Sequence, residues 1–291
     1  MNRTAQTMQG LSLPDTDVLS EQVTVALGQN PSVFTGPGTN TYLIGTGPRR
    51  LLLDTGEGRE SYLSVLESAI ESAGCQGIQE IVLTHGHRDH LGGVAQIRKR
   101  FGPLRVHKLR YPDFDDPHDL EANPLSSGDR IETEGATLCA HHTPGHAPDH
   151  LVYVLEEEGS MFSGDNILGV GTTVIPMETG DLRQYMNSLE DMLGLSPKRI
   201  YPAHGPVIED GCKKIREYIS HRMARETQVV ECLKKKSLTP IEIVRIIYAS
   251  YPENLYEAAT QSITHHLLKL EQENKVTRSS SNPTNASWKL I

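Results

Sequence analysis

Short apolar runs, each about the length of a β-strand, recur through the first two thirds of the chain. Many are rich in Val, Ile, Leu or Tyr, and Gly, Pro or Asp residues bound them, as is typical of strands that end in turns. We therefore predict nine strands. They cover residues 23–28, 41–45, 50–56, 80–85, 104–109, 136–143, 150–156, 160–165 and 199–205.

Between these runs the spacing of apolar residues changes to a helical period. Helices are predicted over 61–74, 92–102 and 181–195. The strands first follow one another directly and then alternate with helices. This order predicts an α/β fold in which sheets are buried between layers of helices.

The pattern changes again after about residue 206. Residues 210–236 read as one long helix, Thr239–Pro240 form a helix start with Pro at the first position, and 253–276 form a further helical run. The remaining tail alternates weakly around a polar turn. Three helices and a hairpin are the outline of a winged-helix module, so we predict two domains, 1–209 and 210–291.

Composition narrows the class of protein. The chain has 291 residues, 37% hydrophobic and 22% charged, which is typical of a globular protein. Its net charge of −9 argues against a broad, non-specific coat for nucleic acid, because such binding depends on many cationic contacts to phosphates. A local basic groove remains compatible with this charge.

The location of the protein is predicted from what the chain lacks. Its four cysteines are widely spaced and contain no CxxC pair, which favours reduced thiols in an intracellular compartment. No apolar run approaches roughly 18 residues, so no membrane span is expected. The N-terminus has no apolar segment of the secretory kind. We predict an intracellular protein of the cytoplasm or mitochondrial matrix.

One segment, THGHRDH, concentrates residues that bind metals. His85 and His87 are two positions apart, so in an extended chain they share a face. Asp89 and His90 are neighbours and cannot share a strand face, and the helical pattern that follows requires the backbone to turn near residues 88–90. Two diverging pairs of ligands at a strand end are what two adjacent metals require.

Three further ligand candidates lie at the ends of later predicted strands. His146, Asp165 and His204 each stand beside Gly or Pro, where turns present side chains outside a sheet. In open α/β sheets such strand ends are where sites form. A mixture of imidazole and carboxylate suits zinc, with manganese and iron as alternatives.

Most other histidines lack this context and are predicted to be ordinary surface or core residues. His150 is intermediate, because it could orient a metal ligand without binding the metal. The histidines without a predicted role are His107, His118, His141, His142, His221, His265 and His266.

Taken together, HxHxDH followed by Gly-Gly, then TPGH, SGD and a late HG, resemble the metallo-β-lactamase superfamily over roughly 20–210. The resemblance implies an αββα sandwich with two Zn²⁺ per chain, or Mn²⁺ or Fe²⁺ in their place. It implies that His85, His87 and His146 bind one metal. Asp89, His90 and His204 would bind the second, and Asp165 would bridge both.

Longer segments are similar to the β-lactamase-like endoribonuclease branch of animal mitochondria, in the glyoxalase II-related group. They include 39–57, 162–174 and 201–208, and the likeness continues through the C-terminal module. It implies cleavage of single-stranded RNA. Only 39 positions separate Asp165 from His204, which is too short for the large inserted domain of the β-CASP nucleases.

The mechanism that this resemblance implies needs no serine or cysteine nucleophile. A hydroxide held by two metals would attack the substrate, because metals lower the pKa of bound water to about 7. Asp89 is the predicted catalytic residue, since its carboxylate can orient this nucleophile. Single-stranded RNA is the predicted substrate of such a zinc-dependent hydrolase.

Two other functions stay open at this point. One is a thioester hydrolase of the glyoxalase II or acyl-carrier type, which would use the same hydroxide on a small-molecule thioester. The other is a non-catalytic nucleic-acid-binding module. A set of lysines in the C-terminal third could form a patch that faces phosphates. For most of them we favour a solvated helix face instead. The set is Lys234, Lys235, Lys236, Lys269 and Lys275. The sequence predicts no oligomeric state.

Overall fold

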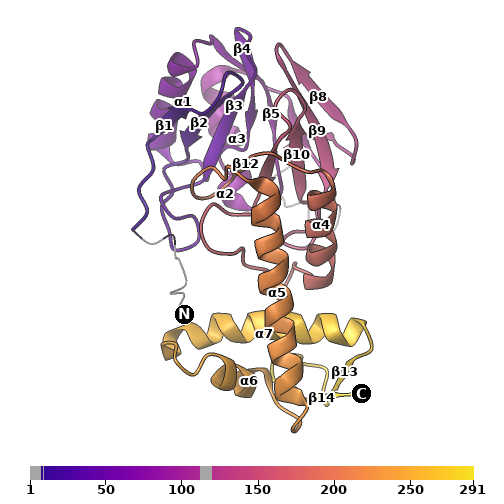
Figure 1. Cartoon of the computed structure of the whole chain (residues 1–291). Coiled ribbons are helices and arrows are strands. Elements are labelled where there is room, and N and C mark those ends of the chain that lie inside the picture. The colour runs from indigo at the N-terminus through magenta and orange to yellow at the C-terminus, as the bar shows by residue number, and fades with distance from the viewer. Residues whose placement is uncertain (1–7, 9, 112–119) are drawn as a thin grey trace.

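The computed structural model describes residue 8 and residues 10–111 and 120–291. Figure 1 shows a layered part formed by about the first two thirds of the chain and a smaller helical part below it, with one long helix running from the first into the second. His118 lies outside the described residues, as do residues 1–7 and 9 of the N-terminal segment on which the targeting prediction rests.

The first sheet has seven strands in sequence order. The first four strands pair in antiparallel fashion, and the last four, β4 to β7, are parallel. The strands are β1 (Thr16–Val18), β2 (Val23–Leu27), β3 (Asn40–Ile44), β4 (Arg49–Leu53), β5 (Gly77–Val82), β6 (Val106–Lys108) and β7 (Asn123–Pro124).

The second sheet has five strands in the order β12-β11-β10-β9-β8. β8 to β11 pair antiparallel, and β12 joins β11 in parallel. The strands are β8 (Arg130–Thr133), β9 (Ala136–His142), β10 (Leu151–Leu155), β11 (Ser160–Gly164) and β12 (Ile200–Pro202).

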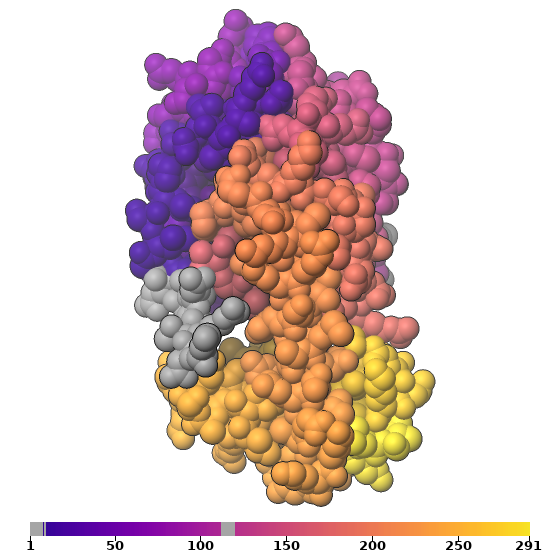
Figure 2. Space-filling view, in the orientation of Figure 1, coloured from indigo at the N-terminus to yellow at the C-terminus, as the bar shows by residue number. Residues whose placement is uncertain are grey.

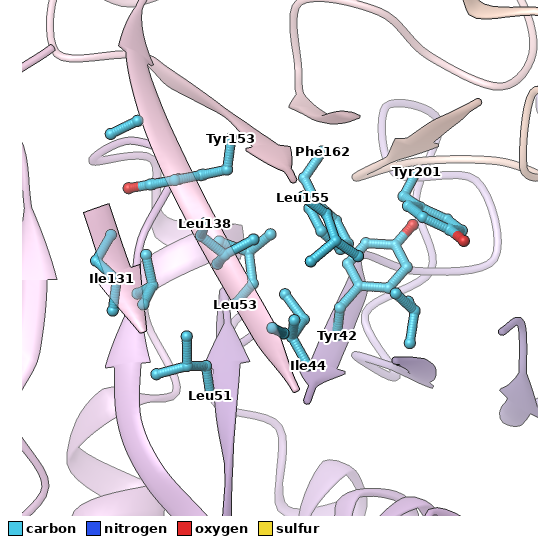
Figure 3. Close-up of a cluster of buried hydrophobic side chains, with 14 of the residues drawn as sticks. Tyr42, Ile44, Leu51, Leu53, Ile131, Leu138, Tyr153, Leu155, Phe162 and Tyr201 are labelled. Carbon is cyan, nitrogen blue, oxygen red and sulfur yellow. The ribbon is translucent and has the colours of Figure 1, made fainter. Parts of the chain in front are cut away.

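Alternation along the strands explains why the two sheets stack. In β4, Leu51 and Leu53 face the second sheet, whereas Leu52 belongs to the core on the opposite face. In β10, Tyr153 faces the first sheet and Val152 faces outward. Figure 3 shows side chains of both sheets meeting in this shared core.

Helices bury the two outer faces. α1 (Glu60–Ser72) and α3 (Val94–Phe101) cover the first sheet, and α4 (Leu182–Gly194) covers the second together with the first half of α5 (Gly211–Leu233). The layer order is therefore helix, sheet, sheet, helix. This confirms the αββα sandwich that the sequence predicted.

The C-terminal part consists of helices closed by a small hairpin. After α5 come α6 (Pro240–Ile247), a 3₁₀ turn at Glu253–Leu255, α7 (Tyr256–Gln272) and the antiparallel strands β13 (Val276–Arg278) and β14 (Trp288–Leu290). Trp288 is fully buried in its core. At the start of α6, the Thr239 N–H donates to the Glu242 carboxylate over 2.8 Å. The predicted winged-helix outline is thus confirmed.

α5 contributes to both cores. Ile215 and Tyr218 pack into the outer layer of the sandwich, whereas Val229 and Leu233 pack into the C-terminal core. Figure 2 shows the same helix on the surface, passing from the upper to the lower part. The proposed boundary before residue 210 stays a prediction, since a continuous helix crosses from one core to the other.

Several expectations about the elements differ from the structure; the strands predicted over 50–56 and 199–205, for example, end at Leu53 and Pro202. β1, β7 and β8 were not predicted, because they are short and carry no long apolar run. The strand expected to reach residue 85 ends at Val82, because the Thr84 N–H donates to the Asp54 carboxylate instead of extending the ladder.

Within the part of the chain that the structure describes, no helix is long and apolar enough to cross a membrane.

Candidate metal centre

The first group of candidate ligands gathers around the loop that follows β5. His85 is fully buried, and its Nε2 lies 2.9 Å from Nδ1 of His87. His146, in the loop before β10, brings its Nε2 to 3.0 Å from the same His87 nitrogen. The three imidazoles therefore converge. They do so in the loop after β5, in which His87 has an extended backbone, and not within the strand itself.

The second group forms beside it, on the short helix α2 (Arg88–Leu91) and after β12. Asp89 and His90 belong to one turn of α2, and His204 follows β12. Oδ2 of Asp89 lies 3.3 Å from His204 Nε2 and 3.4 Å from His90 Nε2. The turn of α2 thus directs its two ligand candidates away from those of the preceding loop.

Asp165 lies between the two groups. It follows β11, and its Oδ1 is 3.1 Å from His204 Nε2 and 3.3 Å from His90 Nε2. Its Oδ2 lies 3.5 Å from His146 Nε2, on the side of the first group. One carboxylate therefore faces both groups, as a bridging ligand must.

These residues fit two divalent metals. Within each group the ligand atoms lie within 4.8 Å of one another. Beyond the close approaches just described, the buried His90 Nε2 and Asp165 Oδ1 have no further hydrogen-bond partner among the described residues. Buried polar atoms are normally fully bonded, so a divalent cation held between the two groups would complete the bonding of these atoms. The fold and the donor set support divalent metals, and the choice of zinc stays a proposal.

Asp54, which the sequence reasoning missed, orients one ligand. It directly follows β4, is almost fully buried, and lies 2.8 Å from Nδ1 of His90 through its Oδ2. The same carboxylate accepts from the N–H and the hydroxyl of Thr84. A histidine whose Nδ1–H is held in this way presents Nε2 to a metal. The available signal was the position of Asp54 directly after an apolar strand, because Asp165 occupies the same position after β11.

Two other ligands are held from outside the groups. Nδ1 of His146 donates to the Val174 carbonyl over 2.7 Å, which leaves Nε2 for a metal. His150 accepts the Asp165 N–H at its Nε2 over 3.1 Å, so it orients the bridging residue as the sequence suggested. Gly164 precedes Asp165 with φ +48°, and a Cβ there would lie 2.6 Å from His150 Nε2.

Burial keeps the first group neutral. It lowers the pKa of His85 and His87, and it lowers the pKa of His146 to about 4. Neutral imidazoles are the form that binds metals.

The second group has the opposite electrostatics. Burial lowers the pKa of His90 and His204, but nearby carboxylates outweigh it, raising the pKa of His204 to about 9 and that of His90 well above its usual value. The same imidazoles hold the pKa of Asp89 and Asp165 low, against the effect of burial. In the absence of metal, protons on these histidines therefore balance the carboxylates, which is the role a cation would take over.

An open cleft of about 470 Å³ leads to both groups. Its floor is formed by ligand candidates of both groups, and its walls by three loops and Arg88 of α2. The floor residues are His87, Asp89, His146, Asp165 and His204; the wall residues are Asn30, Pro31, Ser32, Phe34, Thr35, Glu57, Arg59, Arg88, Leu168, Thr173, Val174 and Pro176.

The other candidates lie away from these groups. His107 pairs with Glu80 at 2.6 Å, and the remaining described histidines without a predicted role lie on β9, α5 and α7. Three lysines of the C-terminal set form ion pairs. Lys234 pairs with Glu231, Lys269 with Glu226 and Glu273, and Lys275 with Glu273. These pairs support a solvated face over a phosphate-binding patch.

Residues 34–204 match the Metallo-beta-lactamase superfamily, and residues 239–288 match the Beta-lactamase associated winged helix domain.

Curated relatives match along nearly the whole chain. The Beta-lactamase-like protein 2 homolog of Drosophila melanogaster is 41% identical over 91% of this chain and 92% of its own, and that of Caenorhabditis elegans is 40% identical over 87% and 85%. The Lactamase-like protein nscB of Aspergillus fumigatus is 37% identical over 95% of this chain and 86% of its own.

Solved structures share the fold. A beta-lactamase domain protein from Burkholderia ambifaria superimposes with a TM-score of 0.80 at 19% identity, covering 97% of this chain and 96% of that one. A metallo-beta-lactamase family protein from Thermus thermophilus gives 0.75 at 22% identity, with 94% and 100% covered.

Proposed function

Because the chain belongs to the metallo-β-lactamase superfamily, whose members are generally metal-dependent hydrolases, we propose that it is an endoribonuclease that cleaves single-stranded RNA at two divalent metals. The observation that carries this proposal is the composition of the cleft. Ligand candidates of both metal groups lie on its floor, while its walls combine cationic side chains with an exposed aromatic ring.

The cationic wall suits a phosphate backbone. The side chains of Arg59 and Arg88 are 59% and 81% exposed. Glu57 pairs with Arg59 at 2.8 Å and lies 3.7 Å from Arg88, so two cations share one carboxylate and positive charge remains. Arginines beside a metal centre bind phosphate without reading the base. They also reconcile a local phosphate site with the net charge of −9.

The aromatic wall suits an unpaired base. Phe34 lines the cleft and is 68% exposed, so its ring is accessible to a ligand in the cleft. Single-stranded RNA is commonly held by stacking of splayed bases on such rings. A paired base cannot offer its face in this way, so the ring supports a single-stranded substrate.

The ligand candidates divide the chemistry. His85, His87 and His146 would hold one metal and Asp89, His90 and His204 the other, with Asp165 contacting both. When bound, two such metals activate water and neutralise charge that develops on a phosphate. We assign the orientation of this water to Asp89, and its position in the cleft lining with a side chain that is 26% exposed supports this assignment. Zinc is proposed, with manganese and iron as alternatives.

The test uses purified protein with zinc or manganese and an end-labelled single-stranded RNA. Wild type is expected to cleave. His87→Ala and Asp165→Asn are expected to lose activity, because the first changes a ligand candidate of the first group and the second changes the carboxylate that faces both groups. Equal cleavage by the variants would show that a contaminating nuclease is responsible and would overturn the proposal.

A second candidate function is thioester hydrolysis. Leu168, Val174 and Pro176 stand in the cleft wall with Phe34 and could hold an acyl chain. Offering lactoylglutathione and an acyl-carrier thioester beside RNA decides between the two functions. Turnover of a thioester at about 1–1000 s⁻¹ with intact RNA would favour this candidate.

The third possibility, a non-catalytic nucleic-acid-binding module, has no use for seven converging ligand candidates. Elemental analysis that found no bound metal would favour it.

The proposed location is the mitochondrial matrix or the cytoplasm, and imaging of the tagged full chain would separate the two.

A further inference from the structure

One wall of the cleft is held by α5, the helix that also forms part of the C-terminal core. The Tyr218 hydroxyl accepts the Leu168 N–H over 3.0 Å and donates to the Gly171 carbonyl over 3.0 Å. Four residues later, Arg222 Nη2 donates to the Thr173 carbonyl over 2.7 Å. Residues four apart lie on one helix face, so a single face of α5 holds the loop between β11 and α4.

The contact made by Arg222 is adjacent to a contact of the metal centre. Arg222 binds the carbonyl of Thr173, and the next carbonyl, of Val174, accepts the Nδ1–H of His146 over 2.7 Å. Peptide groups are planar, so only one φ/ψ pair separates the two carbonyls. Fixing the first carbonyl therefore limits where the second can point.

Arg222 is itself firmly placed. It is 7% exposed, and its guanidinium carbon lies 5.5 Å from the centre of the Tyr185 ring. The Tyr185 hydroxyl donates to the Asn166 carbonyl over 2.6 Å, near the start of the same loop. Burying a guanidinium is costly unless it is bonded, so a buried arginine donating to a loop carbonyl indicates a specific role.

We propose that Arg222 is a positioning residue for the metal centre: it holds the Thr173–Val174 peptide so that the Val174 carbonyl fixes the ring of His146. The inference rests on the metal centre of the proposed function but not on its substrate. It means that the first metal group depends on a helix of the C-terminal part, outside the segment that contains the seven ligand candidates.

The test is the metal affinity of full-length Arg222→Met, measured by competition with a chromophoric chelator and by elemental analysis. Methionine fills the space without a donor. The expected result is an approximately tenfold loss of affinity for one of two metals, at the lower end of the range for residues that orient ligands. Arg222→Lys, which keeps a donor, is expected to recover most of the affinity.

Tyr218→Phe is the matched control. It removes hydrogen bonds from the same helix face to the same loop, but at Leu168 and Gly171, away from Val174. Its two metal affinities are expected to stay near those of wild type. Equal losses in Tyr218→Phe and Arg222→Met, or wild-type affinities in Arg222→Met, would overturn the inference and leave Arg222 a structural residue.

One result separates this inference from the proposed function. Wild type that binds two metals but leaves RNA intact would refute the nuclease and leave the role of Arg222 testable by affinity. If Arg222→Met does not fold, Arg222→Lys and Arg222→Gln are compared instead. Wild-type affinities in Arg222→Gln would overturn the proposal, since the shorter amide cannot reach as the guanidinium does.

Discussion

At the scale of single residues, the candidate metal centre depends on a glycine, Gly164, as well as on its ligand candidates. Gly164 has φ +48°, a conformation that L-residues rarely adopt, and it lies against the ring of the fully buried His150. That ring in turn accepts the N–H of Asp165. The absence of a Cβ at Gly164 therefore lets His150 approach close enough to accept the N–H of Asp165, the candidate bridging residue.

Gly164→Ala is expected to lower both stability and metal content. The left-handed conformation costs about 1–2 kcal/mol for an L-residue, and the new Cβ also collides with a ring that has no room to move. Urea unfolding measures the first effect and elemental analysis the second.

Gly74→Ala provides the comparison for this prediction. Its φ is +65°, but a Cβ there meets nothing within 4 Å, so only the conformational cost applies. Similar losses of stability in both variants, with unchanged metal content in Gly164→Ala, would contradict the role given to the contact.

The stability of the protein is expected to depend on pH through the titration of His266, a buried histidine in the C-terminal core. Burial lowers the pKa of His266 to about 4, against about 6.5 in the unfolded chain. Between these values the unfolded state binds more protons, so stability is complete above about pH 6.5 and is lost as pH falls towards 4. The loss approaches roughly 3 kcal/mol.

His266→Leu removes this titration. The drop in unfolding free energy between pH 7 and pH 4, measured by urea at each pH, is expected to be smaller in the variant by up to about 3 kcal/mol. Burial raises the pKa of Glu226, which lies 3.8 Å from His266, but His266 and Lys269 outweigh it and lower this pKa to about 2. The contribution of Glu226 is therefore lost as pH falls from about 4.5 towards 2, mostly below the range compared here. Parallel pH profiles in variant and wild type would refute the assignment.

Sequence reasoning found the ligand candidates but not the residues that orient them. The cluster from His85 to His90 is recognisable because packing alone does not explain it. Asp54 is a single acid after a strand, and Arg222 one of several arginines in a helical run. Their roles arise from contacts 36 and 49 positions away in sequence, at His90 and Thr173, which periodicity does not encode.

At the scale of elements, the loop between β2 and β3 forms the projecting wall of the cleft. Buried Asn30 holds the loop by accepting the Thr39 N–H and donating to the Thr39 hydroxyl. Thr35 donates to the Asn30 carbonyl, and Ser32 accepts the Phe34 N–H. This network fixes the backbone while Val33 and Phe34 remain exposed.

Phe34→Ala is expected to weaken RNA binding without weakening the fold. Stacking on an aromatic ring contributes about 1–3 kcal/mol per base, whereas exposed substitutions change stability by less than about 0.5 kcal/mol. Fluorescence anisotropy with metal-free protein and a short labelled RNA measures binding without cleavage.

Val33→Ala is the control, because Val33 is 75% exposed on the same loop but does not line the cleft. An RNA affinity reduced equally by both substitutions, or by neither, would argue against a stacking role for Phe34.

The elements themselves were largely predictable, since apolar periodicity reports which faces are buried. The end of β5 was not. EIVLTH reads as one continuous strand, and only the carboxylate of Asp54, which binds the Thr84 N–H, stops the ladder at Val82. The hydrogen bond from Thr84 to Asp54 thus ends the strand just before His85, the first ligand candidate, although the apolar pattern predicts that the strand continues.

At the scale of the whole molecule, the two parts share a helix and are not joined by a loop. Ile215 and Tyr218 complete the outer layer of the sandwich. Gln272 on α7 also donates to Asp181 at the start of α4 over 3.1 Å. The sandwich therefore needs residues beyond its last ligand candidate, His204.

A chain ending at residue 209 is expected to lose cooperative unfolding, because it leaves the apolar surface that Ile215, Tyr218 and Ile219 cover exposed. A chain ending at residue 235 keeps all of α5 and is expected to retain a cooperative transition. Thermal unfolding and binding of a hydrophobic dye compare the two. Cooperative unfolding of the shorter chain at the wild-type temperature would show that the helix is dispensable.

The continuity of α5 has a consequence for any polymer that contacts both parts. Its 23 residues span about 34 Å without a hinge. An RNA strand bound at the C-terminal hairpin would then reach the metal groups at a fixed distance from that contact. The position of cleavage would be set by this distance and not by the base sequence.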